Sequence, residues 1–310
     1  MENPKLLLWA LPFVLVASLL EAIVLTYQAR KNAAAERYDW RAMGASMLDQ
    51  VGRFAMRLVP ISLAAPFFAF AQQHRLLTIP LDTVWAAVVL FVGQEFFYYW
   101  YHRAAHRVRW FWANHSVHHS PNQLNLSAAY RLGWFGKISG VALFFTPLVW
   151  LGFDSTTVLV VLTVNLLYQF WIHATWIPKL GFLEGIVNTP SAHRVHHACN
   201  LRYLDANYGG VLVIFDRLFG TYIAESSDEP CVYGWVKPMT SHNPIKIELT
   251  QWAALVRDVL SAGSIADAVR YLIKPPGWRP HGPGETTDEL RARAGVWPVS
   301  TDTPERLQTL

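Results

Sequence analysis

Charged residues are scarce in this sequence. Asp, Glu, Lys and Arg make up only 15% of its 310 residues, whereas an ordinary soluble domain has about 25%. Hydrophobic residues account for 53%, including 14 Trp and 17 Phe, and the mean hydropathy is +0.20. The net charge of +4 is too small to indicate a nucleic-acid partner. The composition is that of an integral membrane protein, and we expect no nucleic-acid binding.

Cysteines and the common cofactor motifs are also lacking. Cys199 and Cys231 form no C-x-x-C pair, which argues against a disulfide scaffold and a thiolate metal site. Cys199 follows His197 by two residues, and we interpret it as a bystander thiol. The sequence has no haem-attachment motif, flavin fingerprint, iron–sulfur cysteine set or H-E-x-x-H zinc motif. The sequence therefore shows no electron-transfer cofactor motif of its own.

Histidine, in contrast, is concentrated in one stretch. Nine of the 12 histidines lie between positions 102 and 197, as one H-x-x-x-H motif, two H-x-x-H-H motifs and one single residue. Residues three and four apart lie on one face of a helix, so each motif directs two or three imidazoles at a common volume. The nine are His102, His106, His115, His118, His119, His173, His193, His196 and His197.

Nine imidazoles exceed what one metal ion can bind. Shared between two ions they supply four or five ligands each, which predicts a dinuclear site. Imidazole suits Fe, Zn, Cu and Ni, but zinc has no redox chemistry and its catalytic sites usually have three protein ligands. Two irons fit better, because together they can take up two electrons and use O2 to oxidise an unactivated C–H bond. His173 stands alone, and a hydrogen-bonded core histidine is the alternative interpretation there.

Glu95 is a further candidate for the site. It precedes His102 by seven residues, or two helical turns, and so lies on the same face. A carboxylate at membrane depth costs about 2.5–3.5 kcal/mol and usually marks function. Two interpretations stay open: Glu95 supports the metal site or lines its pocket, or it makes a structural hydrogen bond, for instance with Gln94 or Asn165.

Five apolar segments are candidates for membrane spans. The first, Leu6–Thr26, is interpreted as a retained helix because it is too long for the apolar part of a signal peptide. A three-residue turn at 153–155 predicts that the last two form a helical hairpin. We therefore expect an all-α integral membrane protein with four to five transmembrane helices and a helical cytoplasmic cap that carries the histidine motifs. The other four segments are 55–73, 81–101, 136–152 and 156–176.

Basic residues predict the orientation of this multi-pass chain. They gather in the loop 27–54 and the stretch 102–137, and such loops face the cytoplasm. The N-terminus then lies outside, and all four histidine groups reach one depth on the cytoplasmic face.

The chain divides into three predicted regions. Residues 1–80 hold N-terminal transmembrane segments, 81–222 form the catalytic region, and 223–310 form a cytoplasmic cap and tail. Within them, 211–219 is too short to span and predicts an interfacial helix or a buried strand. Residues 248–274 predict one or two amphipathic helices, and the proline-rich tail from Pro275 predicts a loop.

The histidine pattern resembles that of the fatty acid hydroxylase/sterol desaturase superfamily over roughly residues 85–222. The segments around the second and third motifs, 114–120 and 188–193, are similar to those of the family, and so is 207–221. The stretch 275–280 looks most like the alkylglycerol monooxygenase-like branch and its bacterial relatives. One departure is Ala192, where that branch often has another histidine before the third motif.

This resemblance implies an O2-dependent hydroxylase or desaturase with two irons at the cytoplasmic face. The nine histidines would be the ligands, and the substrate would be a lipid that enters from the bilayer, such as an ether lipid, a fatty acyl chain or a sterol. The electron donor would be a partner protein or a small reductant such as a reduced pterin.

Other interpretations of the same residues remain. A histidine-rich membrane metal transporter would place its ligands near the bilayer midplane, and a zinc-dependent membrane hydrolase is a second alternative. Asn207 and Asp216 could orient ligands, or they could form a tight turn and a surface ion pair. Asn165, Tyr168 and Gln169 could line a pocket, or they could only hold helices together.

Overall fold

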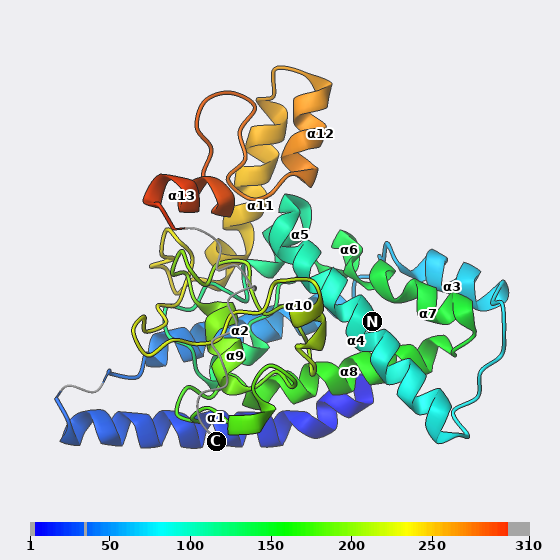
Figure 1. The fold of residues 1–310 in the computed structure, drawn as a ribbon, viewed down its shortest axis with the longest axis horizontal. Coiled ribbons are helices and arrows are strands. Elements are labelled where there is room, and N and C mark those ends of the chain that lie inside the picture. The colour runs from blue at the N-terminus through cyan, green and yellow to red at the C-terminus, as the bar shows by residue number, and fades with distance from the viewer. Residues whose placement is uncertain (1–3, 34–35, 297–310) are drawn as a thin grey trace.

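A computed structural model describes residues 4–33 and 36–296 (Figure 1). Every regular element in these ranges is a helix, which confirms the all-helical prediction. Two isolated β-bridges, Val187 with Leu212 and Ala198 with Tyr233, are the only strand-like pairings among these residues.

Helix α1 (Pro4–Lys31) is the longest helix and runs along the bottom of Figure 1. Within the described ranges it is the one helix that is long and apolar enough to cross a membrane, over Trp9–Lys31. Its apolar side chains point outward: Trp9 and Phe13 are each 78% exposed. The predicted helix over Leu6–Thr26 is confirmed, and its outward apolar surface suits contact with lipid.

The predicted span over 55–73 is wrong. Helix α2 (Trp40–Arg57) is capped by Asp39, whose side-chain carboxylate accepts hydrogen bonds from the backbone amides of Arg41 and Ala42. It ends at Arg57, and a non-helical stretch separates it from the nine-residue helix α3 (Ala65–Gln73). Pro60 lies in that stretch, where it has no amide hydrogen for a helix and disfavours helical geometry in the residue before it.

The expected span over 136–152 is also wrong. The chain forms three short pieces, α6 (Gly136–Ser139), η2 (Val141–Phe145) and α7 (Thr146–Leu151). Gly140, between the first two, has a left-handed φ of 81°, which ends α6. Helix α8 (Ser155–Trp171) follows α7 and contacts it, so the predicted hairpin exists with one short arm.

Helix α4 (Val84–Arg107) passes through the middle of the molecule. It covers the predicted segment 81–101 from residue 84 onward and continues through the first histidine motif. Its buried side packs against η2, α7 and α8 in the largest hydrophobic cluster, which includes Leu90, Tyr98, Phe145 and Leu148. The first histidine motif is thus attached to the best packed part of the fold.

Short elements carry the rest of the middle region. The motif helices are α5 (Arg109–His115) and α9 (Pro190–His197), and α9 starts with the cap residue Thr189 followed by proline at its first position. The segment predicted over 211–219 contains a short helix, α10 (Ile214–Leu218). Two short 3-10 helices, η1 (Leu126–Tyr130) and η3 (Gly181–Leu183), complete this region.

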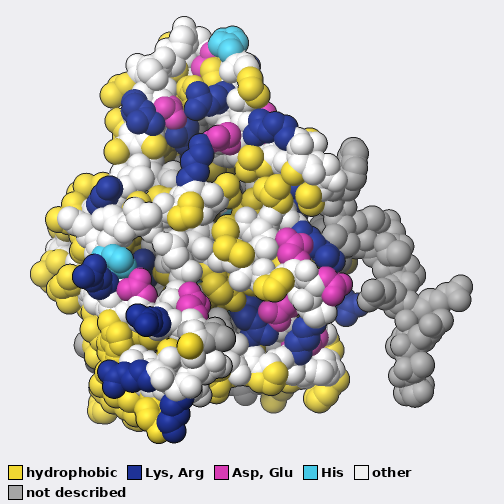
Figure 2. Space-filling model, turned by 90° about the vertical axis from the view of Figure 1, so that its left-hand side faces the viewer, with side chains coloured by type: hydrophobic (Ala, Val, Ile, Leu, Met, Phe, Trp, Pro, Cys, Tyr) yellow, Lys and Arg dark blue, Asp and Glu magenta, His cyan; other side chains and the backbone are white. Residues whose placement is uncertain are grey.

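The C-terminal part rises above this body (Figure 1). Helices α11 (Pro244–Leu260) and α12 (Ile265–Ile273) pack together, which confirms the prediction of one or two amphipathic helices over 248–274 and shows that there are two. The tail is not all loop, because α13 (Thr287–Ala294) forms with a reciprocal cap between Thr286 and Glu289. The face at the left of Figure 1 carries many Lys, Arg, Asp and Glu side chains (Figure 2), as a water-exposed face does.

Candidate metal centre

All nine predicted histidines converge in the interior. They come from α4, from α5 and the turn after it, from the turn after α8, and from α9. Each of the nine side chains is 8% exposed or less. His173, the single residue, lies among the others, so the structure brings together the whole predicted set.

The nine separate into two adjacent groups. Within each group, one nitrogen per ring lies within 4.8 Å of the corresponding nitrogens of all the others. Each H-x-x-H-H motif contributes to both groups, so the two groups are built from shared helices. The first group is His102, His106, His115, His119 and His196, and the second is His118, His173, His193 and His197.

Distances between neighbouring rings fit ligands of a common ion. The Nε2 atoms of His102 and His115 are 3.0 Å apart, and those of His115 and His119 are 3.2 Å apart. In the second group, the Nε2 atom of His193 lies 3.1 Å from that of His173 and 3.0 Å from that of His197. Imidazole nitrogens sit about 2.0–2.1 Å from an ion such as zinc, which places cis ligands about 3 Å apart.

Backbone carbonyls determine which nitrogen of several rings carries the proton. A carbonyl only accepts, so each Nδ1 that faces one must donate to it, and the Nε2 of the neutral ring keeps its lone pair. The hydrogen bonds from Nδ1 to a backbone carbonyl join His102 to Tyr208 (2.8 Å), His118 to Arg131 (3.2 Å), His173 to Gln169 (2.7 Å) and His196 to Ala206 (2.9 Å).

Burial also keeps these rings neutral. It lowers the pKa of His118 to about 4, and it lowers the pKa of His196 and His197 well below the ordinary value. The Nε2 atom of His196 is buried and has no hydrogen-bond partner among the described residues. Nε2 lone pairs of His118 and His173 face each other at 3.4 Å. Such an arrangement is unfavourable by itself and fits a metal ion between the rings.

The segment 205–208 supports three rings of the first group. Asp205 Oδ1 lies 3.6 Å from His106 Nδ1, Ala206 accepts from His196, and Tyr208 accepts from His102. Sequence reasoning missed Asp205, although carboxylates commonly orient metal-binding histidines. Burial would raise the pKa of Asp205, but His106 and Arg107 hold it at about 2, so this carboxylate is charged.

Asn207 and Asp216 hold that segment in place. Asp216 is fully buried and accepts the amides of Tyr208 and Gly209 at 2.7 and 2.8 Å, so a surface ion pair is the wrong interpretation. Asn207 has a φ of 55°, and its side-chain NH2 group donates to the backbone carbonyls of Ala192 and Ile223. Asn207 is therefore both a turn residue and a link between α9 and the supporting segment.

Glu95 does not belong to either histidine group. Its Oε1 atom accepts from Asn165 at 2.5 Å, and its Oε2 atom accepts the amides of Val211 and Leu212 at 2.7 and 2.9 Å. The structural hydrogen bond with Asn165 is thus present, and Gln94 is not a partner. Glu95 connects α4 to α8 and to the loop before α10.

The polar residues of α8 extend this connection. Asn165 accepts from Gln169 at 2.7 Å, and Gln169 accepts from Tyr98 of α4 at 3.1 Å. Gln169 also supplies the carbonyl for His173, while Tyr168 donates to the carbonyl of Asn188. These residues hold helices together, as the second of the two interpretations stated.

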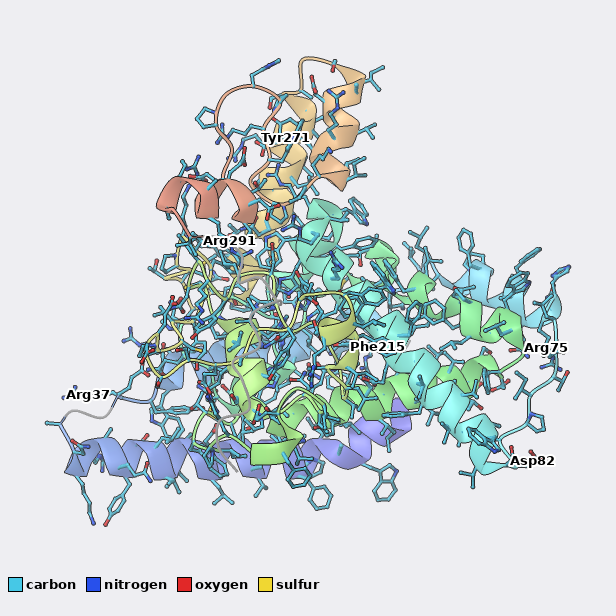
Figure 3. All side chains as sticks on the ribbon, viewed as in Figure 1. Arg37, Arg75, Asp82, Phe215, Tyr271 and Arg291 are labelled. Carbon is cyan, nitrogen blue, oxygen red and sulfur yellow. The ribbon has the colours of Figure 1, made fainter. Side chains whose placement is uncertain are left out.

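Two cavities reach the histidines from different sides. The first, about 280 Å³, is lined by His106, His119, His196 and His197 and by residues of the C-terminal part such as Trp235. Arg291 of α13 donates to the carbonyls of residues 201, 202 and 204 and so connects α13 to the segment after α9 (Figure 3).

The second cavity, about 420 Å³, touches the centre at His115 and His118. Its walls are mainly aromatic and aliphatic and include Tyr101, Phe145 and Leu162. Both volumes fall near the range of small-molecule sites. Apolar walls of this kind suit a hydrocarbon chain.

These features define a helical protein with two adjacent, buried histidine groups that can hold metal ions. Residues 87–221 match the family described as Fatty acid hydroxylase, and the chain belongs to this family. This match includes all nine histidines and the segment 205–208.

Named relatives are similar over much of the chain. Alkylglycerol monooxygenase of Homo sapiens is 35% identical over 282 residues, which is 91% of this chain and 62% of that protein. Ornithine lipid hydroxylase of Rhizobium tropici is 34% identical over 128 residues, 41% of this chain and 39% of that protein. A very-long-chain aldehyde decarbonylase of Oryza sativa subsp. japonica is 30% identical over 211 residues, 63% of this chain and 73% of that protein.

The chain spans 53% to 62% of the length of the alkylglycerol monooxygenases that it matches. No solved structure matches it.

Proposed function

We propose that the protein is a membrane-bound di-iron oxygenase that hydroxylates a lipid with O2. The observation that carries this proposal is the division of nine buried imidazoles into groups of five and four. Two bound irons would supply the reduction of O2 and the oxidation of a C–H bond. Desaturation by the same centre is the alternative reaction.

The substrate that we propose is an ether lipid, since several relatives are named alkylglycerol monooxygenase. One oxygen atom enters a C–H bond and the other leaves as water, which takes up two electrons from a reductant and two protons. If the oxidised carbon carries the ether oxygen, the product is a hemiacetal, which breaks into an aldehyde and an alcohol.

The residues of this chain position the centre and the lipid. Tyr208, Ala206 and Asp205 fix the orientation of three rings of the first group, and Asp205 adds the negative charge that neutral imidazoles lack. The apolar walls of the second cavity align a lipid chain beside His115 and His118 and exclude water from it.

The membrane arrangement is part of the proposal. The chain is multi-pass, with its N-terminus outside and the centre at the cytoplasmic face, as the basic loops predict. Residues 1–80 contain the transmembrane helix α1, residues 81–222 are the catalytic region and residues 223–310 are the cap and tail. Exposed apolar side chains on α4, such as Val84 and Trp85, support contact of its first turns with lipid. A partner protein or a small reductant such as a reduced pterin supplies the electrons.

Mass spectrometry of lipids from cells with and without the protein, grown under isotopically labelled O2, tests the function. We expect one labelled oxygen in a lipid product, and loss of that product with the His196→Ala variant, which stays folded in the membrane. Purified protein should hold two irons per chain. One zinc per chain, or formation of the product in the absence of O2, would indicate a hydrolase and contradict the proposal.

A further inference from the structure

The second cavity combines apolar walls with three basic side chains. Arg53 and Arg57 of α2 and Lys137 of α6 line it together with His115 and His118. Among the described residues that line this cavity, none is Asp or Glu. The histidines are buried and the three basic residues are half-buried, so the basic residues lie nearer the surface.

The three basic residues are held close to one another. Arg53 and Arg57 are four residues apart on one helix and therefore lie on one face. Lys137 Nζ donates to the carbonyls of Arg57 and Val59 at 3.3 and 2.6 Å. These two bonds place the ammonium at the C-terminal end of α2 and use two of its three N–H donors. The cations are thus part of a fixed arrangement.

Nearby carboxyl groups leave a surplus of positive charge at the cavity. Asp49 and Glu248 contact two residues that line the cavity. Asp49 accepts a hydrogen bond from the backbone amide of Leu132 at 3.1 Å, and Glu248 accepts one from the backbone amide of Trp134 at 3.0 Å. Burial, together with the neighbouring carboxyl group, raises the pKa of Glu248, and burial also raises the pKa of Asp49. Both shifts disfavour the charged form, so this pair offsets less of the charge of the basic side chains than two free carboxylates would.

We propose that this cavity selects a lipid with an anionic head group, bound by Arg53, Arg57 and Lys137, with its chain directed toward His115 and His118. Arginine forks match the oxygen geometry of phosphates and carboxylates, and lysine adds a point charge. This inference rests on the proposed function and adds a phosphate or carboxylate head group to the lipid substrate proposed there.

Native mass spectrometry of the full chain in neutral detergent tests the selection without requiring turnover. The protein is given equal amounts of an alkylglycerol, the corresponding alkylglycerol phosphate and a fatty acid of the same chain length. We expect one anionic lipid per chain, favoured over the uncharged alkylglycerol by about tenfold, the effect of one charged contact. Preference for the phosphate or for the fatty acid identifies the head group. Equal retention of all three lipids would overturn the inference.

Variants show whether these side chains are responsible. Arg57→Gln should bring the preference close to parity, while Arg41→Gln, an exposed residue on the same helix outside the cavity, should leave it unchanged. If both variants lose the preference for anionic lipid to the same extent, the lipid is attracted to the basic surface in general, and this result would also overturn the inference. Added salt gives a check that needs no variant, since it should weaken retention of the anionic lipids only.

Failure of this inference and failure of the proposed function are distinguishable. Turnover of lipid without head-group preference would contradict the selection alone. Head-group preference without any O2-dependent product would contradict the oxygenase alone.

Discussion

Replacing Glu95 by alanine removes a buried carboxylate that joins three parts of the fold. Its oxygens accept from the Asn165 side chain at 2.5 Å and from the amides of Val211 and Leu212 at 2.7 and 2.9 Å. A buried donor left without an acceptor costs about 1–3 kcal/mol. The two amides are only partly buried, so water compensates in part. We expect the free energy of unfolding to fall by about 3 kcal/mol. A typical domain has only about 5–15 kcal/mol of stability.

Glu95→Gln is the matched comparison. Glutamine keeps the shape and one acceptor oxygen, so it can still bind the amides of Val211 and Leu212. It then presents an NH2 group to Asn165, whose own oxygen already accepts from Gln169. We expect a loss of about 1 kcal/mol from this one mismatched contact. The stability order should be wild type, then Glu95→Gln, then Glu95→Ala.

Denaturant unfolding in a fixed detergent, followed by tryptophan fluorescence, measures this order. Metal analysis of the folded fraction accompanies it and should give the wild-type metal content, because Glu95 contacts neither histidine group. A Glu95→Gln variant with wild-type stability but less metal would refute this reasoning. Glu95 would then act on the metal centre rather than on the fold.

Three further predictions concern the centre and its support. His196→Ala and His193→Ala should each reduce bound metal from two ions per chain toward one, because they belong to different groups; unchanged metal in either, by elemental analysis, would contradict the grouping. Gly210→Ala should cost about 1–3 kcal/mol of unfolding free energy, because an added Cβ overlaps the carboxamide of Asn165. Gly263→Ala, where a Cβ meets nothing within 4 Å, should unfold like the wild type. Equal destabilisation by the two glycine substitutions would contradict the overlap with Asn165 as the cause. Asp205→Asn should weaken metal affinity about 10–100-fold in chelator competition, and unchanged affinity would show that the carboxylate does not support His106.

The histidine motifs could be predicted because their spacing is local. Residues three and four apart on a helix share a face, so each motif was expected to gather its rings, although His118 and His119 lie in the turn after α5. The same local patterns predicted α1, α4, α8 and the amphipathic pair α11 and α12. The spans at 55–73 and 136–152 failed because apolar content alone does not make a continuous helix. Pro60 and Gly140 interrupt them.

The sequence by itself determined which nine side chains could bind metal and that the chain is helical and apolar. Only the tertiary structure decided how those nine divide, because His118 and His119 are neighbours in sequence yet belong to different groups. It also decided what orients the rings. Most of those partners are backbone carbonyls, such as those of Ala206, Tyr208 and Gln169. A carbonyl is present at every residue and gives no signal in a sequence, so its role depends on where the folded chain places it.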